Sequence, residues 1–161
     1  MKAVDIYTDG ACLGNPGAGG YGAVLLYRGA RRELSAAYTR TTNNRMEILA
    51  AIVALEALKE PCRVNLYSDS RYLVDAVEKG WAARWQAAGW MRNRREAAQN
   101  ADLWERLLPL LAKHQLRFIW VRGHAENAEN NRCDAMARAA IEAAAKNGDF
   151  LEDIGYERHE N

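Results

Sequence analysis

The glycine-rich stretch between residues 10 and 22 constrains the fold of this chain more than any other feature. It follows a strand-like run, "AVDIYTD", that ends on Asp9, and it contains a formal G-x-G-x-x-G at Gly17, Gly19 and Gly22. In a dinucleotide site this pattern must open a helix, because the helix N-terminus holds the pyrophosphate. Here the chain continues as "AVLLYRG", an apolar run typical of a second strand. The context excludes a nicotinamide-nucleotide site and predicts that the glycines punctuate a β-hairpin.

The rest of the chain alternates between strand-like and helical patterns, which predicts one mixed α/β domain. Further strand-like runs are "YGAVLLYRG", "RELSAAYTR", "RVNLYSD" and "LRFIWVRG", the first two joined by a turn at residues 28–30. Helical spacing begins at Asn44 and stops before Pro61, and helices are also expected at about residues 70–79, 102–113 and 128–146. We expect the domain to span residues 1–148, followed by an acidic, mobile tail over residues 149–161.

Composition narrows the class of protein only slightly. The chain has 161 residues, and 22 basic against 21 acidic side chains leave a net charge of +1. This balance neither indicates nor excludes a nucleic-acid partner, because the distribution of the charges decides that question. The cysteines, Cys12, Cys62 and Cys133, are odd in number and form no C-x-x-C, which favours free thiols in a reducing compartment. With no signal-peptide core and no membrane-spanning run, we expect a soluble, cytoplasmic protein.

Four acidic residues are the candidates for chemistry. The runs "IYTDG" and "LYSDS" place Asp9 and Asp69 at strand ends, where open α/β sheets bind ligands, and Glu47 and Asp134 fall on expected helices. Each has a structural alternative. Asp9 could open a turn, Asp69 could cap the next helix, Glu47 could form a capping box with Asn44, and Asp134 could complement a helix dipole. Clustered together, the four would need a cation, and oxygen ligands suit Mg²⁺ or Mn²⁺ rather than zinc. Both interpretations stay open at this level.

Five blocks of sequence carry a resemblance to a known family. They are "YTDGACLGNPGAGGYG", "TTNNRMEILAAIVALEALK", "YSDSRYL", "NADLW" and "VRGHAENAENNRCDAMA". In unbroken order over about residues 3–145, they closely resemble ribonuclease H of type 1, the bacterial RNase HI family. The resemblance implies an RNase H-like fold, a five-stranded mixed sheet flanked by helices, in a monomer. It also implies an endoribonuclease that hydrolyses the RNA strand of RNA–DNA hybrids and leaves 5′-phosphate and 3′-hydroxyl ends.

The resemblance further implies the catalytic residues. The family's four acidic metal ligands fall on Asp9, Glu47, Asp69 and Asp134, and its auxiliary histidine, which shuttles a proton or helps product release, falls on His124. Two Mg²⁺ ions about 4 Å apart, replaceable by Mn²⁺, would act on the scissile phosphate, one activating a water and the other stabilising the departing 3′ oxygen. Asp9 would bridge both ions, Asp134 would lie on the nucleophile side, and Glu47 and Asp69 on the other. After His124 the chain reads "AENAENN", where many relatives carry glycine, a second histidine and proline.

Substrate contacts are implied in two regions. Residues matching those that read 2′-hydroxyls in the minor groove, or hold a phosphate of the DNA strand, are Gly10, Cys12, Asn15, Thr42, Asn43 and Asn44, with Arg71 where relatives often carry a glutamine. Residues 81–99 resemble the family's basic protrusion, which grips the DNA strand. Its candidates are Trp81, Arg84, Trp85, Arg92, Arg94 and Arg95. Trp81 and Trp85, four residues apart, are alternatively expected to pack on the core.

Two other functions are compatible with the sequence. The chain could be a module that binds hybrids or double strands and whose acids are only structural. It could instead be another nuclease or transferase of the same fold, such as an integrase-like or junction-resolving enzyme. The four acids in register argue against the first function. The hybrid-reading block "TTNNRME" and the lack of an extra domain argue against the second. Mg²⁺-dependent cleavage of a hybrid would separate the first alternative from the enzyme.

Overall fold

A computed structural model describes residues 1–123 and 127–156 of the chain. The elements in this range are β1 (Lys2–Leu13), β2 (Gly17–Tyr27), β3 (Ala30–Thr41), α1 (Asn43–Glu56), β4 (Cys62–Ser68), α2 (Arg71–Glu78), α3 (Trp81–Ala87), α4 (Ala101–Lys113), β5 (Gln115–Trp120) and α5 (Ala128–Asn147). They form a five-stranded sheet of order β3-β2-β1-β4-β5. The pairs β1–β2 and β2–β3 are antiparallel, whereas β1–β4 and β4–β5 are parallel. The predicted five-stranded mixed sheet is confirmed.

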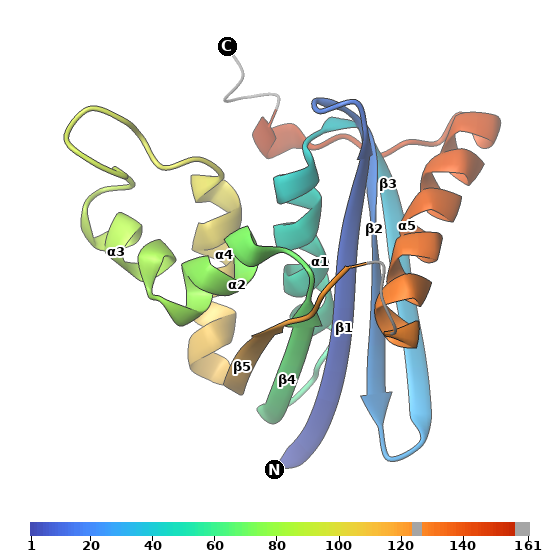
Figure 1. The fold of residues 1–161 in the computed structure, drawn as a ribbon, viewed down its shortest axis with the longest axis horizontal. Coiled ribbons are helices and arrows are strands. Elements are labelled where there is room, and N and C mark those ends of the chain that lie inside the picture. Colours follow the sequence, from blue (N-terminus) through green and yellow to red (C-terminus); the bar gives the residue numbers. More distant parts are fainter. Residues whose placement is uncertain (124–126, 157–161) are drawn as a thin grey trace.

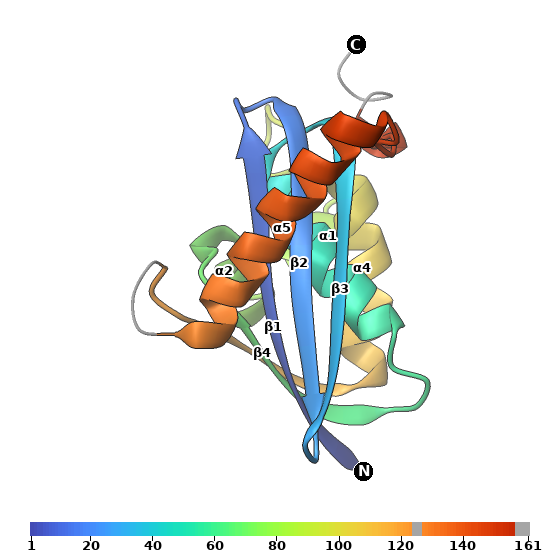
Figure 2. The same ribbon diagram turned by 90° about the vertical axis from the view of Figure 1, so that its right-hand side faces the viewer.

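Helices cover both faces of this sheet (Figures 1 and 2). Helix α1 is buried between one face and α4, and α5 crosses the opposite face over β1, β2 and β3. Ile48 and Ile52 of α1 meet Ile6 of β1 and Leu66 of β4 in the main core, and all four side chains are fully buried. Because α1 is apolar on nearly every side, its position between two layers follows from its sequence.

Strand β1 does not end at Asp9, as the sequence suggested, but continues to Leu13. Its parallel pairing with β4 stops at Thr8, opposite Ser68, whereas its antiparallel pairing with β2 goes on. The backbone hydrogen bonds to β2 keep this part of the strand extended, and Asp9 lies opposite Gly22. Asp9 therefore sits inside β1, at the level where its other neighbour, β4, ends.

Two glycines of β2, Gly20 and Gly22, allow α5 to pack closely on the sheet. A Cβ atom added to Gly22 would lie 2.3 Å from the carbonyl oxygen of Cys133, and one added to Gly20 would lie 2.9 Å from that of Ala137. Both carbonyls belong to α5, so any side chain at these positions would displace the helix. The predicted hairpin is confirmed, because β1 and β2 pair antiparallel on either side of a turn at residues 14–16. Gly14 lies in that turn with a positive φ, whereas Gly20 and Gly22 lie within β2.

Residues 150–156 of the expected tail are not solvated throughout but pack against the domain. Leu151 pairs with Tyr38 beside β3, and Asp153 is buried near the start of α1. The Asp153 carboxylate accepts hydrogen bonds from the Thr41 hydroxyl at 2.7 Å and from the guanidinium of Arg45 at 2.7 and 2.9 Å. Arg45 is itself only 2% exposed, so Asp153 supplies a counter-charge that the interior requires. The rest of the expected tail, residues 157–161, lies outside the described residues.

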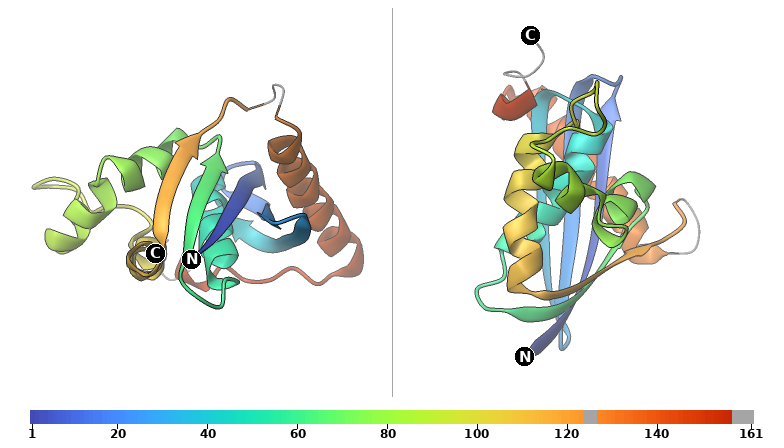
Figure 3. Two further views of the ribbon diagram at one scale, coloured as in Figure 1. Left: turned by 90° about the horizontal axis from the view of Figure 1, so that it is seen from below. Right: turned by 90° about the vertical axis from the view of Figure 1, so that its left-hand side faces the viewer.

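The predicted basic segment, residues 81–99, projects from one side of the structure (Figure 1). Helix α3 and the loop that follows it extend away from the sheet on the side of α2 (Figures 1 and 3).

The expected free cysteines are confirmed, since Cys12, Cys62 and Cys133 form no disulfide. None of the helices in the described part of the chain combines the length and apolarity needed to cross a membrane.

Candidate active site

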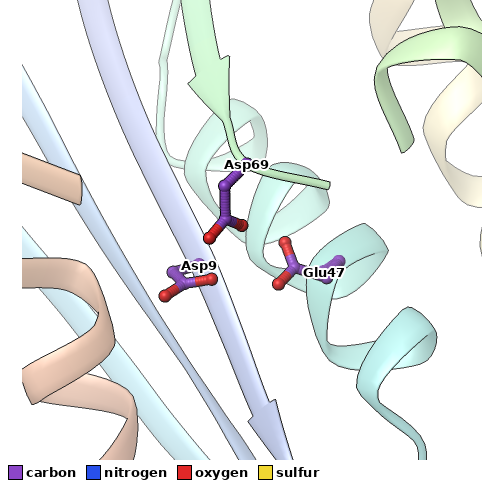
Figure 4. A group of neighbouring side chains, drawn as sticks. All are labelled: Asp9, Glu47 and Asp69. Atoms are coloured by element: carbon purple, nitrogen blue, oxygen red, sulfur yellow. The ribbon is translucent and has the colours of Figure 1, made fainter. Parts of the chain in front are cut away.

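Three carboxylates converge where β1, β4 and α1 meet (Figure 4). Asp9 comes from the middle of β1, Glu47 from the start of α1, and Asp69 directly follows β4. Each offers an oxygen atom, and these oxygens all lie within 4.8 Å of one another. Residues that are distant in sequence thus form one compact group, as the parallel pairing of β1 with β4 predicts.

The structural alternatives for these acids are not realised. Helix α1 is capped by Thr42, whose hydroxyl accepts a hydrogen bond from the Arg45 amide, so Glu47 completes no capping box with Asn44. Helix α2 is capped by Ser70, not by Asp69. Asp9 opens no turn, because it lies inside a paired strand. These carboxylates therefore lack the local structural role that would explain them.

Gly10 allows the close approach of α1 to β1. A Cβ atom at this position would lie 2.8 Å from the backbone nitrogen of Glu47. The Gly10 amide donates to a carboxylate oxygen of Glu47 at 2.9 Å and to one of Asp9 at 3.0 Å. Ser68 also donates to Glu47, at 3.5 Å. The backbone of β1 thus orients two of the three carboxylates.

Burial makes the negative charge of this group costly. Asp9 is 5% exposed and Glu47 is 2% exposed. Burial, reinforced by the charges of Asp69 and Asp134, raises the pKa of Asp9 to about 7. Burial, reinforced by Asp9, raises the pKa of Glu47 well above its usual range. A bound cation would reverse both effects, because it would favour the ionised carboxylates.

Asp134 lines the same cleft from α5 but is held by another charge. Its carboxylate forms an ion pair with Arg138, one helical turn later, at 3.1 Å. Arg138 also lines the cleft, and the sequence reasoning missed it, although the four-residue spacing on a helix was a usable signal. The predicted auxiliary residue, His124, lies outside the described residues.

The cleft has a volume of about 460 Å³ and is lined by five of the residues predicted to contact substrate. Gly10, Cys12, Asn43, Asn44 and Arg71 line it together with the four acids. Two other predicted residues support its rim. Asn15 accepts a hydrogen bond from the Asn43 amide at 3.0 Å, and Thr42 caps α1.

Trp81 and Trp85 of the basic segment were expected either to contact substrate or to pack on the core. Trp81 contacts Trp85, and Trp85 contacts the fully buried Trp104 of α4, with ring centroids 6.4 and 6.2 Å apart. The packing of Trp81 and Trp85 on the core is therefore confirmed.

The arginines of the same segment differ in their partners. Arg84 donates to the Lys79 carbonyl, and Arg92 forms an ion pair with Glu96. Arg94 and Arg95 are exposed. Their guanidinium groups form no ion pair within the residues that the structure describes, so no protein carboxylate there competes with a ligand for them.

Comparison with known proteins identifies relatives along nearly the whole chain. A family model described as RNase H matches residues 1–142. A ribonuclease H of Syntrophus aciditrophicus (strain SB) is 63% identical over 156 residues, which cover 97% of this chain and 88% of the relative. A ribonuclease HI of Synechocystis sp. (strain ATCC 27184 / PCC 6803 / Kazusa) is 58% identical over 156 residues, covering 96% and 95% of the two chains.

Solved structures show the same fold. LC9-RNase H1, described as a type 1 RNase H with the type 2 active-site motif, superposes with a TM-score of 0.79 at 32% identity, covering 89% of this chain and 74% of that one. LC11-RNase H1 in complex with RNA/DNA hybrid superposes with a TM-score of 0.67 at 24% identity, covering 88% and 99%. The match to the family model and the identity to these relatives show that the chain belongs to the RNase H family.

Proposed function

We propose that this chain cleaves the RNA strand of RNA–DNA hybrids at the cleft lined by Asp9, Glu47, Asp69 and Asp134. Membership of the RNase H family makes it a metal-dependent nuclease. The observation that carries the proposal is the convergence of three carboxylates within 4.8 Å, without the caps or turns that would give them a structural role. Products would carry 5′-phosphate and 3′-hydroxyl ends.

The residues present fit a hard divalent cation. Every donor of the group is a carboxylate oxygen, which suits Mg²⁺ or Mn²⁺. The raised pKa values of Asp9 and Glu47 indicate that the group lacks sufficient positive charge of its own. Asp9, Glu47, Asp69 and Asp134 would hold two ions. Such ions supply activation of the attacking water and stabilisation of the departing 3′ oxygen.

The protein contributes by holding the carboxylates in position before a cation binds. Asp9 is fixed in a paired strand and lies beside Glu47 and Asp69, which suits the bridging position. Glu47 is oriented by the Gly10 amide, so little reorganisation is needed when a cation enters. Asp134 faces the cleft from α5, and we assign it to the nucleophile side. We retain His124 as the residue that moves a proton or assists product release, on the strength of the sequence resemblance.

Recognition of a hybrid is assigned to two surfaces. Solved relatives include an RNase H bound to RNA/DNA hybrid. Asn43 and Asn44 open α1 at the rim of the cleft, where their side-chain amides can meet 2′-hydroxyls and phosphate. The basic loop after α3 supplies Arg94 and Arg95 to a second strand. Only a hybrid offers both a ribose strand to the first surface and a deoxyribose strand to the second.

The test is incubation of the purified protein with end-labelled duplexes, with and without Mg²⁺. We expect the RNA strand of a hybrid to be cut at several positions, and RNA duplex, DNA duplex and single strands to survive. A DNA duplex with one embedded ribonucleotide should be a poor substrate, because minor-groove reading needs several neighbouring 2′-hydroxyls. Hybrid binding with no Mg²⁺-dependent cleavage would instead favour a non-catalytic module, and equal cutting of RNA duplex would refute the specificity.

A further inference from the structure

An exposed tryptophan lies at the edge of the carboxylate cleft. Trp120 ends β5, where it pairs in register with Ser68, the last residue of β4. It is 38% exposed, although burial of so large an apolar side chain is usually favourable. Its place beside the strand that delivers Asp69 suggests a role beyond packing.

Trp120 makes two directed contacts. Its indole N–H donates to the backbone carbonyl of Asp69 at 3.1 Å. The guanidinium of Arg71 stacks on the ring face of Trp120. The central carbon of this guanidinium lies 4.0 Å from the ring centroid, well inside the range of a cation–π interaction. One side chain thus contacts both a carboxylate-bearing residue of the site and a cation that lines the cleft.

The position of Arg71 is not explained by the stability of its own helix. It is the first residue of α2, where the helix dipole disfavours a positive charge. It is exposed, and within the described residues its guanidinium donates to no protein acceptor. Stacking leaves the N–H groups at the edge of the guanidinium plane free to donate, and it restricts the long side chain before any ligand arrives.

We propose that Trp120 is a positioning residue that holds the Arg71 guanidinium at the rim of the cleft, as a preset donor to the substrate, and fixes the backbone of Asp69. This rests on the proposed function, since the substrate is the nucleic acid whose acceptors reach the carboxylates. The ring face stacks against the guanidinium of Arg71, and the indole N–H donates to the backbone carbonyl of Asp69. The two roles depend on different parts of one side chain, so substitutions can separate them.

The experiment compares Arg71→Gln, Trp120→Leu, Trp120→Phe and the double variant Arg71→Gln/Trp120→Leu with the parent. Hybrid affinity is measured by fluorescence anisotropy in metal-free buffer, kcat and KM with Mg²⁺, and stability by thermal melting. Arg117→Gln, a charge removed from an exposed position on the same strand β5, is the matched control. Melting temperatures should stay close to that of the parent, because both side chains are exposed.

We expect Arg71→Gln to weaken hybrid affinity roughly five- to tenfold, as for loss of one ordinary hydrogen bond, and Trp120→Leu to weaken it about two- to fivefold. In the Arg71→Gln background, Trp120→Leu should weaken affinity no further. Trp120→Phe keeps a ring under Arg71 and should retain affinity, while kcat falls because the Asp69 carbonyl loses its donor. The control should match the parent.

Additive effects of Arg71→Gln and Trp120→Leu would overturn the stacking role, and an unchanged kcat in Trp120→Phe would overturn the role at Asp69. The affinity measurements do not depend on cleavage. An inactive parent with coupled affinities would therefore contradict the proposed function while supporting the position assigned to Arg71.

Discussion

Gly22 and Cys133 bring the fourth acid to the other three. Gly22 lies opposite Asp9 in the β1–β2 register, and α5 rests on it so closely that a Cβ atom would approach the Cys133 carbonyl oxygen to 2.3 Å. Asp134 is the next residue along that helix. A contact between backbone and backbone thus sets the distance between the β1 carboxylate and the α5 carboxylate.

Gly22→Ala should therefore damage stability and activity together. The added methyl group must push α5 away from β2, at a cost of about 1–3 kcal/mol, and Asp134 moves with the helix. We expect a lower melting temperature and a reduced kcat with little change in hybrid affinity. Gly29→Asn is the control, since Gly29 lies in a left-handed turn that asparagine tolerates and has nothing within 4 Å of its Cβ position. A fully active, fully stable Gly22→Ala variant would contradict this reading of the contact.

The stability of the metal-free protein should fall as the pH rises from about 4 to 8 through the contribution of Asp9. Its pKa is raised to about 7 in the folded state, against about 3.9 in the unfolded chain. The folded state therefore binds the proton more tightly, and this stabilisation is lost as pH passes the folded pKa. Glu47, whose pKa is also raised, acts in the same direction.

The matched measurement is thermal melting of the parent and of Asp9→Asn, in chelator, across this pH range. His114, whose pKa is lowered by burial, opposes the trend in both proteins and cancels in the comparison. The variant should be the more stable protein at pH 8, and the difference should shrink toward pH 4. Added Mg²⁺ should stabilise the parent more than the variant. A constant difference at every pH would show that Asp9 does not titrate as described.

The arginines in the loop after α3 should control the salt dependence of hybrid binding. Each phosphate contact contributes about one unit to the slope of log affinity against log salt, so Arg94→Ala/Arg95→Ala should lower that slope by up to about two units. Glu96→Gln should raise it, because it frees Arg92 from its ion pair. Arg63→Ala, an exposed charge on β4, is the control. If all slopes equal that of the parent, the loop arginines do not contact phosphate.

Removal of the buried charge of Asp153 should destabilise the fold without touching the carboxylate cleft. Asp153→Asn leaves Arg45 with only part of its counter-charge, at a cost on the order of 3 kcal/mol. The expected result is a clearly lower melting temperature, while kcat at a temperature below the transition changes little. Asp149→Asn removes an exposed acid from the same segment and should be neutral. Equal melting temperatures for the two variants would mean that the Arg45 pair adds no net stability.

Much of the fold could be predicted from the sequence. The change from strand-like to helical spacing near Asn44 located α1, and the five strand-like runs correspond to β1–β5. That β1 and β4 lie side by side did not follow from the residue pattern alone. The limits of β1 could not be predicted, because its extension to Leu13 depends on hydrogen bonds to β2 rather than on its own side chains. Local patterns report the burial of a strand, whereas its length depends on its partner.

The candidate site was predicted in its acids but not in their supports. Asp9, Glu47 and Asp69 came from motif blocks. The ion pair of Arg138 with Asp134 was accessible from their helical spacing, whereas the contact of Trp120 with Asp69 exists only in the folded chain. The tail was misread for the same reason. Its acidic composition suggested a solvated segment, but Asp153 forms a buried ion pair with Arg45, a residue distant in sequence. An acid with a distant buried partner cannot be told from a solvated one by composition.

The most direct test of the central claim is the rate of RNA cleavage by Asp9→Asn, with labelled hybrid and saturating Mg²⁺. The change is nearly isosteric, and a neutral amide is a poor replacement for a carboxylate ligand of hard divalent cations. Asp5→Asn, an exposed acid on the same strand, is the control and should cleave like the parent. We predict that Asp9→Asn cleaves slower than the parent by several orders of magnitude while it still binds the hybrid and melts no lower in chelator. Cleavage at a rate near that of the parent would remove Asp9 from the metal site and contradict the account.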